Sequence, residues 1–194
     1  MPPQLQPLVA AVRQHYARGA NLTPDGTLQV GPMPWVGPEG FALVLYAPPG
    51  PGWLAGFAAR AGRAVPEPYG AVLAALNGCF AFGLALYGLP PSLHQRPVRP
   101  DRRVLEPLDL DAANRYWAQR YRAAEGAFHF GGRTWTATEN LGYFITPGGG
   151  FQSRRDGGEL VREWSSLRDL LAEELAAAEE RDRESRPSAR WPLR

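Results

Sequence analysis

The sequence contains no lysine, because all 21 of its basic residues are arginine. This absence excludes sites and reactions that depend on a lysine: the phosphate-binding loop with its Gly-Lys-Ser/Thr signature, Schiff-base catalysis and pyridoxal chemistry. A GC-rich genome that avoids lysine codons would produce the same composition. We therefore use the missing lysine only to exclude these classes of protein.

Cysteine and histidine are scarce as well. Cys79 is the single cysteine and cannot form an internal disulfide, and the histidines His15, His94 and His129 lack the spacing of metal ligands. We expect no metal site, no cofactor and a reducing, intracellular environment. Cys79 is expected to be a small buried hydrophobic residue, and the histidines are expected to have surface or structural roles.

Long apolar runs are also missing. No segment approaches the 18 apolar residues that a membrane helix needs, and the N-terminus lacks the basic start and apolar stretch of a signal peptide. The sequence therefore predicts a soluble, cytoplasmic protein with no membrane contact. The middle of the chain is basic and its C-terminal third is acidic, within a net charge of +2. This asymmetry is too weak to predict nucleic-acid binding, which needs a dense basic face.

Length and composition predict one folded domain. A chain of 194 residues has the usual size of a single domain, and a hydrophobic share of 44% is enough for a sizeable core. The 22 glycines and 20 prolines predict many turns and short elements, so the expected fold class is α+β. We interpret Pro48–Gly52 as the boundary between an N-terminal extension (1–50), which contains a helix and strands, and a main domain (51–178). A charged tail (179–194) follows.

Hydrophobic periodicity and turn signals predict the individual elements. Helices are expected at 5–18, 53–60, 66–76, 109–124 and 167–178. Strands are expected at 27–30, 41–47, 80–86, 127–130, 134–138, 143–146, 151–154 and 160–164. The clearest strand is Phe80–Leu86, where large and small side chains alternate with a period of two. The main domain is expected to hold a central antiparallel or mixed sheet of about five to six strands flanked by helices.

A glycine pattern gives a weak signal for nucleotide binding. Gly50, Gly52 and Gly56 resemble a dinucleotide fingerprint, but prolines stiffen this loop and a second helix follows it in place of a parallel strand. We favour a proline- and glycine-rich connector. Nucleotide binding or an enzymatic role stays open as a third hypothesis.

Carboxylates provide no obvious catalytic pair. Glu173 and Glu174 are expected on a solvated helix face. Glu139 and Asn140 lie between two apolar strand segments, where Glu139 could turn inward, although a role in a hairpin turn is favoured. No Gly-x-Ser-x-Gly elbow is present. We therefore expect no catalytic residue and no enzymatic activity.

Arginines and an exposed tryptophan supply the candidates for a binding surface. Arg99, Arg102 and Arg103 lie in a proline-rich segment that is expected to be an irregular surface loop, and Arg115 lies on the helix that follows. Guanidinium groups bind carboxylates or phosphates through paired hydrogen bonds, although interleaved acidic residues could equally pair with them at the surface. An aromatic side chain in a loop can anchor a partner. The candidate partner-binding residues are Arg99, Arg102, Arg103, Arg115, Trp35 and Glu139.

Five segments, in order, resemble the SUKH superfamily. They cover roughly residues 53–178, about two thirds of the chain. They are WLAGFAARAGRAVPEPYGAVLAALNG (Trp53–Gly78), FAFGLALYG (Phe80–Gly88), LDLDAANRYW (Leu108–Trp117), FHFGGRTWTATENLGYFI (Phe128–Ile145) and EWSSLRDLLAEEL (Glu163–Leu175). The first contains the short helix, the proline-to-tyrosine step and the helix ending in Asn-Gly that recur in this superfamily. Residues 1–50 have no obvious counterpart in it.

The resemblance implies a compact α+β domain without catalytic residues. Bacterial members of the superfamily are mostly immunity proteins that neutralise toxins, often nucleases, by direct binding. We therefore expect a bacterial immunity protein that binds a cognate polymorphic toxin. The alternative is an intracellular regulatory or scaffolding module that binds a host protein, as do the fungal cell-wall regulators of the same superfamily.

Overall fold

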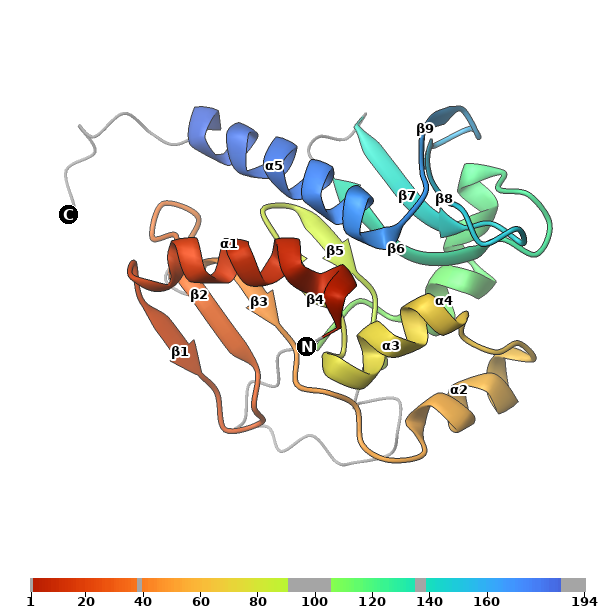
Figure 1. Ribbon diagram of the computed structural model, residues 1–194, viewed down its shortest axis with the longest axis horizontal. Helices are drawn as coiled ribbons and strands as arrows, with labels where there is room; N and C mark the ends of the chain where they lie inside the picture. The colour runs from red at the N-terminus through yellow and green to blue at the C-terminus, as the bar shows by residue number, and fades with distance from the viewer. Residues whose placement is uncertain (1, 38–39, 91–105, 135–138, 186–194) are drawn as a thin grey trace.

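The computed structural model describes residues 2–37, 40–90, 106–134 and 139–185, which form an α+β fold built on one antiparallel sheet (Figure 1). The strands are β1 (Ala20–Leu22), β2 (Leu28–Pro32), β3 (Phe41–Leu45), β4 (Cys79–Ala81), β5 (Leu84–Leu86), β6 (Phe128–Thr134), β7 (Asn140–Ile145), β8 (Phe151–Arg155) and β9 (Leu160–Trp164). The helices are α1 (Gln6–Tyr16), α2 (Trp53–Ala61), α3 (Glu67–Ala75), α4 (Leu110–Arg115) and α5 (Leu167–Ser185), with 3₁₀ turns η1 (Pro3–Leu5) and η3 (Trp117–Tyr121).

The sheet is a meander in which each strand pairs with the next one along the chain. Its antiparallel character confirms the expected fold class, but within the described residues it has nine strands rather than five to six. One reason is that β1, β2 and β3 join the same sheet through the pairing of β3 with β4. The strands of the N-terminal extension and those of the main domain therefore share one sheet. Of the strand expected at 134–138, only Thr134 lies within the described residues.

A tight turn is the second reason for the larger number of strands. The segment Phe80–Leu86 was expected to be one strand, which is wrong: it forms the hairpin of β4 and β5, in which Ala81 pairs with Leu84. Phe82 and Gly83 have φ angles of 50° and 92°, and two consecutive positive φ angles are typical of the two-residue turn that best matches strand twist. Large and small residues alternate through this turn as well, so the pattern hides it.

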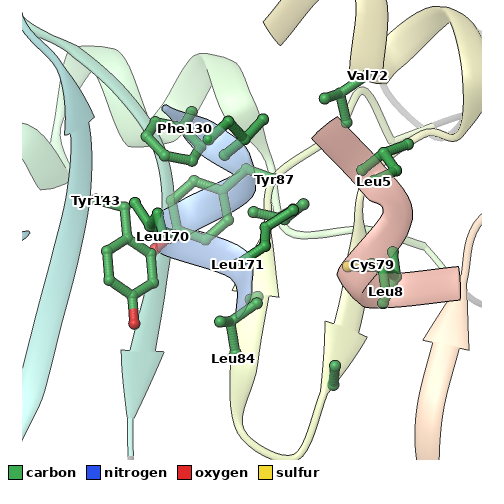
Figure 2. Packing of buried hydrophobic residues seen from close by; sticks show 14 of the residues in the cluster. Leu5, Leu8, Val72, Cys79, Leu84, Tyr87, Phe130, Tyr143, Leu170 and Leu171 are labelled. Atoms are coloured by element: carbon green, nitrogen blue, oxygen red, sulfur yellow. The ribbon is translucent and has the colours of Figure 1, made fainter. Parts of the chain in front are cut away.

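One face of the sheet is covered by α1 and α5, which pack against each other (Figure 1). Figure 2 shows how Leu170 and Leu171 from α5 and Leu5 and Leu8 from the N-terminal helical segment enter the same core. The core also takes in Val72 from α3. The N-terminal segment and the final helix therefore complete a core that neither could bury alone.

Two helical boundaries differ from expectation. The helix expected at 109–124 is divided, because Tyr116 leaves helical geometry between α4 and η3, although Asp109 caps α4 by accepting a hydrogen bond of 2.8 Å from the Asp111 amide. The final helix continues past residue 178 to Ser185. Its last turns carry an Arg183–Glu180 ion pair of 2.8 Å, a spacing that supports an exposed helix.

His129 lies on the opposite face of the sheet, turned away from Phe128 as strand alternation predicts. Its ring is fully buried and stacks on Phe144 at 4.4 Å, with the Tyr121 ring against its edge at 5.2 Å. Burial lowers the pKa of His129 to about 4, although backbone carbonyls, including that of Ala113 at 3.3 Å from Nδ1, oppose the shift. The ring is therefore neutral in the folded protein near pH 7, and its role is structural.

Acid is expected to weaken the fold through His129. Between its ordinary pKa of 6.5 and the folded value of about 4, the unfolded chain binds a proton that the folded chain does not, so stability falls as pH drops through this window. The shift corresponds to about 3 kcal/mol. Denaturant unfolding at a series of pH values should show this loss in the wild type and its absence in His129→Phe. Equal acid dependence in the two proteins would contradict the assignment.

Candidate functional site

The described candidate residues lie in separate elements. Trp35 is in the turn between β2 and β3, Glu139 directly precedes β7, and Arg115 ends α4. Arg99, Arg102 and Arg103 lie outside the described residues. Trp35 and Glu139 are nevertheless both linked to the C-terminal half of α5. Trp35 is linked through Arg18 and His15 to Glu179, and Glu139 pairs directly with Arg181.

Trp35 presents the chemistry of a binding anchor. Its side chain is 41% exposed, and the guanidinium carbon of Arg18 lies 5.9 Å from the centre of its ring. The adjacent Val36 is 66% exposed, and Tyr16, at the end of α1 near Arg18 in sequence, is 57% exposed. Tryptophan and arginine are the residues most enriched among those that dominate protein–protein affinity. We call Trp35, Val36 and Arg18 the Trp35 corner.

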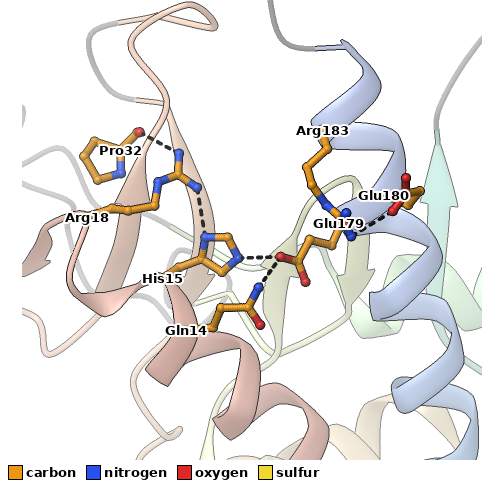
Figure 3. A network of polar contacts seen from close by, with 7 residues as sticks. All are labelled: Gln14, His15, Arg18, Pro32, Glu179, Glu180 and Arg183. Atoms are coloured by element: carbon orange, nitrogen blue, oxygen red, sulfur yellow. Dashed lines mark hydrogen bonds and ion pairs between the residues drawn. The ribbon is translucent and has the colours of Figure 1, made fainter.

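A chain of hydrogen bonds holds Arg18 in place (Figure 3). Arg18 Nη1 donates to His15 Nδ1 at 2.8 Å, and His15 Nε2 lies 3.0 Å from Glu179 Oε1. Because a guanidinium can only donate, Nδ1 must accept, so the hydrogen of the neutral ring is on Nε2 and is donated to Glu179. Gln14 donates to the same oxygen at 2.6 Å. The arginine beside Trp35 is thus anchored on α5 through a buried imidazole.

Sequence reasoning missed this network. It placed Glu179 in a charged tail and assigned no partner to His15, whereas Glu179 is helical and His15 is 4% exposed. A signal for His15 was present, because it continues the buried stripe of Leu8 and Ala11 at helical spacing. No local pattern indicates its partner, which is 164 residues away in the chain.

Glu139 does not enter the core. Its side chain is exposed and accepts a hydrogen bond of 2.6 Å from Arg181 Nη2 of α5. Both side chains are about half exposed, so this ion pair adds little stability. The pair places Glu139 beside α5, because Arg181 lies two residues after Glu179, the residue that contacts His15.

Arg115 is engaged within its own helix. Its Nε donates to Asp111 Oδ1 at 2.8 Å and its Nη2 donates to Asp111 Oδ2, which gives a bidentate pair one turn apart. The neighbouring Tyr116 is 63% exposed. The guanidinium of Arg115 is therefore already paired with Asp111 and not held ready for an acidic group of a partner. Pairing between neighbouring charges at the surface was the alternative that the sequence left open.

The expected position of Glu174 is wrong. It was expected on a solvated face but is 6% exposed, because it lies on the leucine stripe of α5. Its Oε2 accepts from Arg133 Nη1 and from the Tyr143 hydroxyl. Burial raises the pKa of Glu174, and these two partners oppose the shift. This buried group of three holds α5 against β6 and β7.

Cys79 and the glycines that resemble a dinucleotide fingerprint have structural surroundings. Cys79 is buried as expected, and desolvation raises the pKa of its thiol to about 12. Gly52 directly precedes α2, and the indole of Trp53 packs on Gly50. All strands of the described sheet are antiparallel, so the strand–helix–strand unit that a dinucleotide fingerprint requires is not formed there.

Two further features are absent from the described residues. They contain no group of three or more histidine, cysteine, aspartate or glutamate side chains arranged to hold a metal ion. Among the same residues, no helix combines the length and apolar character needed to cross a bilayer.

Comparison with known proteins gives no identification. No protein-family model matches the chain, and no curated protein or solved structure matches it significantly.

Proposed function

We propose that the protein is a cytoplasmic, non-catalytic immunity protein that neutralises a cognate toxin by binding it directly, with the Trp35 corner as its principal anchor. The five segments that resemble the SUKH superfamily motivate the class of function. The α+β fold is compatible with that pattern. The surface of Trp35, Val36 and Arg18 motivates the location of the contact.

The proposal rests on the contacts that hold Arg18 against the exposed ring of Trp35. Trp35 is 41% exposed, and the arginine over its ring is held by buried His15, which in turn bonds Glu179. A side chain held in this way loses little conformational entropy when a partner binds. Preorganisation of this kind is expected of a tight binding surface rather than of a solvated turn.

Capture and rescue together test the function. The full chain is used as bait in an extract of its native cells, the retained protein is identified by mass spectrometry, and its gene is expressed in a heterologous host with and without the chain. We expect the retained protein to be toxic alone and harmless when co-expressed. Retention of a non-toxic regulatory protein instead would favour the scaffolding alternative and overturn the immunity assignment.

Replacing Trp35 with alanine is expected to weaken capture of that partner by about 2 kcal/mol, a loss of about 30-fold in affinity, because tryptophan anchors commonly contribute this much. Titration calorimetry with the purified partner measures the change. Tyr116→Ala is the matched control, since it removes an aromatic side chain that is at least as exposed but lies on the α4–η3 corner. Equal losses in the two variants would contradict the assignment of the contact.

A further inference from the structure

The solvent side of α5 carries a second stripe of residues besides the buried leucines. Asp169, Ala172, Ala176, Glu180 and Arg183 are all exposed and recur at intervals of three and four residues. This is the spacing by which one helix packs along another. Leu170, Leu171 and Leu175, by contrast, point into the core. We call the five exposed residues the outer stripe.

An open groove runs beside the outer stripe, between α5 and α1. Its volume is about 480 Å³, and its lining combines the small residues Ala172 and Ala176 of α5 and Pro7 and Ala10 of α1 with the longer polar side chains Gln6, Gln14, Arg168 and Glu179. Small side chains on both walls let another helix approach closely, since interaxial distances of about 8 Å require such residues at the contact. A helix laid along the outer stripe would therefore contact both α5 and α1.

The charges of the outer stripe are complementary to those of a second copy of the stripe that runs antiparallel to it. Asp169 lies seven residues before Ala176 and Arg183 seven residues after it, about 10 Å on either side. Two copies placed antiparallel across a two-fold axis at Ala176 would bring each Asp169 opposite an Arg183. A parallel arrangement would instead place like charges together at both ends. The charge pattern thus favours a second copy of this chain as the partner, with its α5 helix antiparallel.

We propose that the outer stripe of α5 is the interface of a homodimer, in which the α5 helices of two copies pack antiparallel about Ala176. Alanines form the centre of the contact, and a pair between Asp169 and Arg183 closes each end. Arg183 already pairs with Glu180 of its own helix at 2.8 Å, so it would bridge two carboxylates across the interface. This inference is independent of the toxin-binding proposal.

The test is the mass of the full chain in solution, measured by size-exclusion chromatography with light scattering over a concentration series. We expect the wild type to approach twice the 21.2 kDa of one chain. Ala176→Glu places two carboxylates at the two-fold axis and is expected to raise the dimer dissociation constant at least about tenfold. Ala177→Glu is the matched control, because Ala177 is also exposed on α5 but lies outside the outer stripe.

A charge exchange tests the direction of the helices. Arg183→Asp should weaken the dimer, and so should Asp169→Arg, which also removes hydrogen bonds with Ser165 and Ser166 at the start of α5. The double variant carries the same loss at the start of the helix but restores opposite charges, so its dimer should be tighter than either single variant's. A wild type that stays monomeric would overturn the proposal, as would a dimer that Ala176→Glu and Ala177→Glu affect equally. A double variant no better than the single ones would overturn the antiparallel arrangement.

Discussion

Replacing Gly78 with alanine is expected to lower the free energy of unfolding by about 2–5 kcal/mol, the combined cost of left-handed backbone and of overpacking. Gly78 has a φ angle of +78°, which side chains other than glycine rarely adopt. A Cβ atom there would overlap the carbonyl oxygen of Leu86 and lie 3.0 Å from the carbonyl carbon of Tyr87. Both are backbone atoms of buried residues, at the end of β5 and directly after it, and cannot move aside cheaply.

The neighbouring Asn77 shows why this segment cannot shift. Its buried side chain donates to the Leu89 carbonyl at 2.9 Å and accepts from the Leu89 amide at 2.7 Å. The Asn-Gly pair thus joins the end of α3 to the segment that follows β5. The sequence indicates only that this pair ends a helix, whereas its larger role is a contact between two backbones.

Gly149→Ala provides the matched control for Gly78→Ala. Gly149 has a φ angle of +84°, close to that of Gly78, but a Cβ atom there would meet nothing within 4 Å. Its cost should therefore be the backbone term alone, about 1–2 kcal/mol. Chemical denaturation of both variants measures the difference. Equal losses would show that the close approach to Leu86 has no energetic weight.

The second large effect is expected from Arg133→Leu, which should destabilise the protein by about 3–5 kcal/mol at neutral pH. Arg133 and Glu174 have side-chain exposures of 13% and 8%, so removal of the cation leaves a carboxylate buried without its ion-pair partner. The Tyr143 hydroxyl remains as a donor to Glu174 but carries no charge. Denaturant unfolding is again the measurement.

The pH dependence of Arg133→Leu should distinguish a buried charge from lost packing. Burial already raises the pKa of Glu174, and loss of Arg133 should raise it further. Because the folded pKa is then above the unfolded one, the penalty is absent below the unfolded pKa, grows as pH rises from the unfolded to the folded pKa, and is constant above it. The double variant Arg133→Leu, Glu174→Leu should recover much of the loss. A loss that is independent of pH and is not recovered would contradict this account.

The sequence predicts well those elements whose pattern is set locally. The strand at 160–164 has the predicted bounds, and the strand at 151–154 is only one residue longer than expected, because glycine-rich turns delimit both. The hairpin at Phe82 was missed because phenylalanine gives no signal for a positive φ angle. A bulky residue is held in that conformation by tertiary contacts, among them the His15 ring 5.1 Å from the Phe82 ring.

The candidate site was predictable only in part. Trp35 follows from its place in a proline- and glycine-rich turn, and its exposure agrees with that reading. The inward position of Glu174 could have been read from its spacing to Leu170, Leu171 and Leu175 in α5. The link from Arg18 through His15 to Glu179 joins the two ends of the chain, and periodicity carries no information about such pairings.

Oxidative footprinting of Trp35 in the presence of the captured partner tests the central claim most directly. If the Trp35 corner is the anchor, formation of the complex should strongly slow oxidation of Trp35 and leave exposed Tyr116 unchanged. A complex in which Trp35 is oxidised as fast as in the free protein would contradict the account, because the partner would then bind elsewhere.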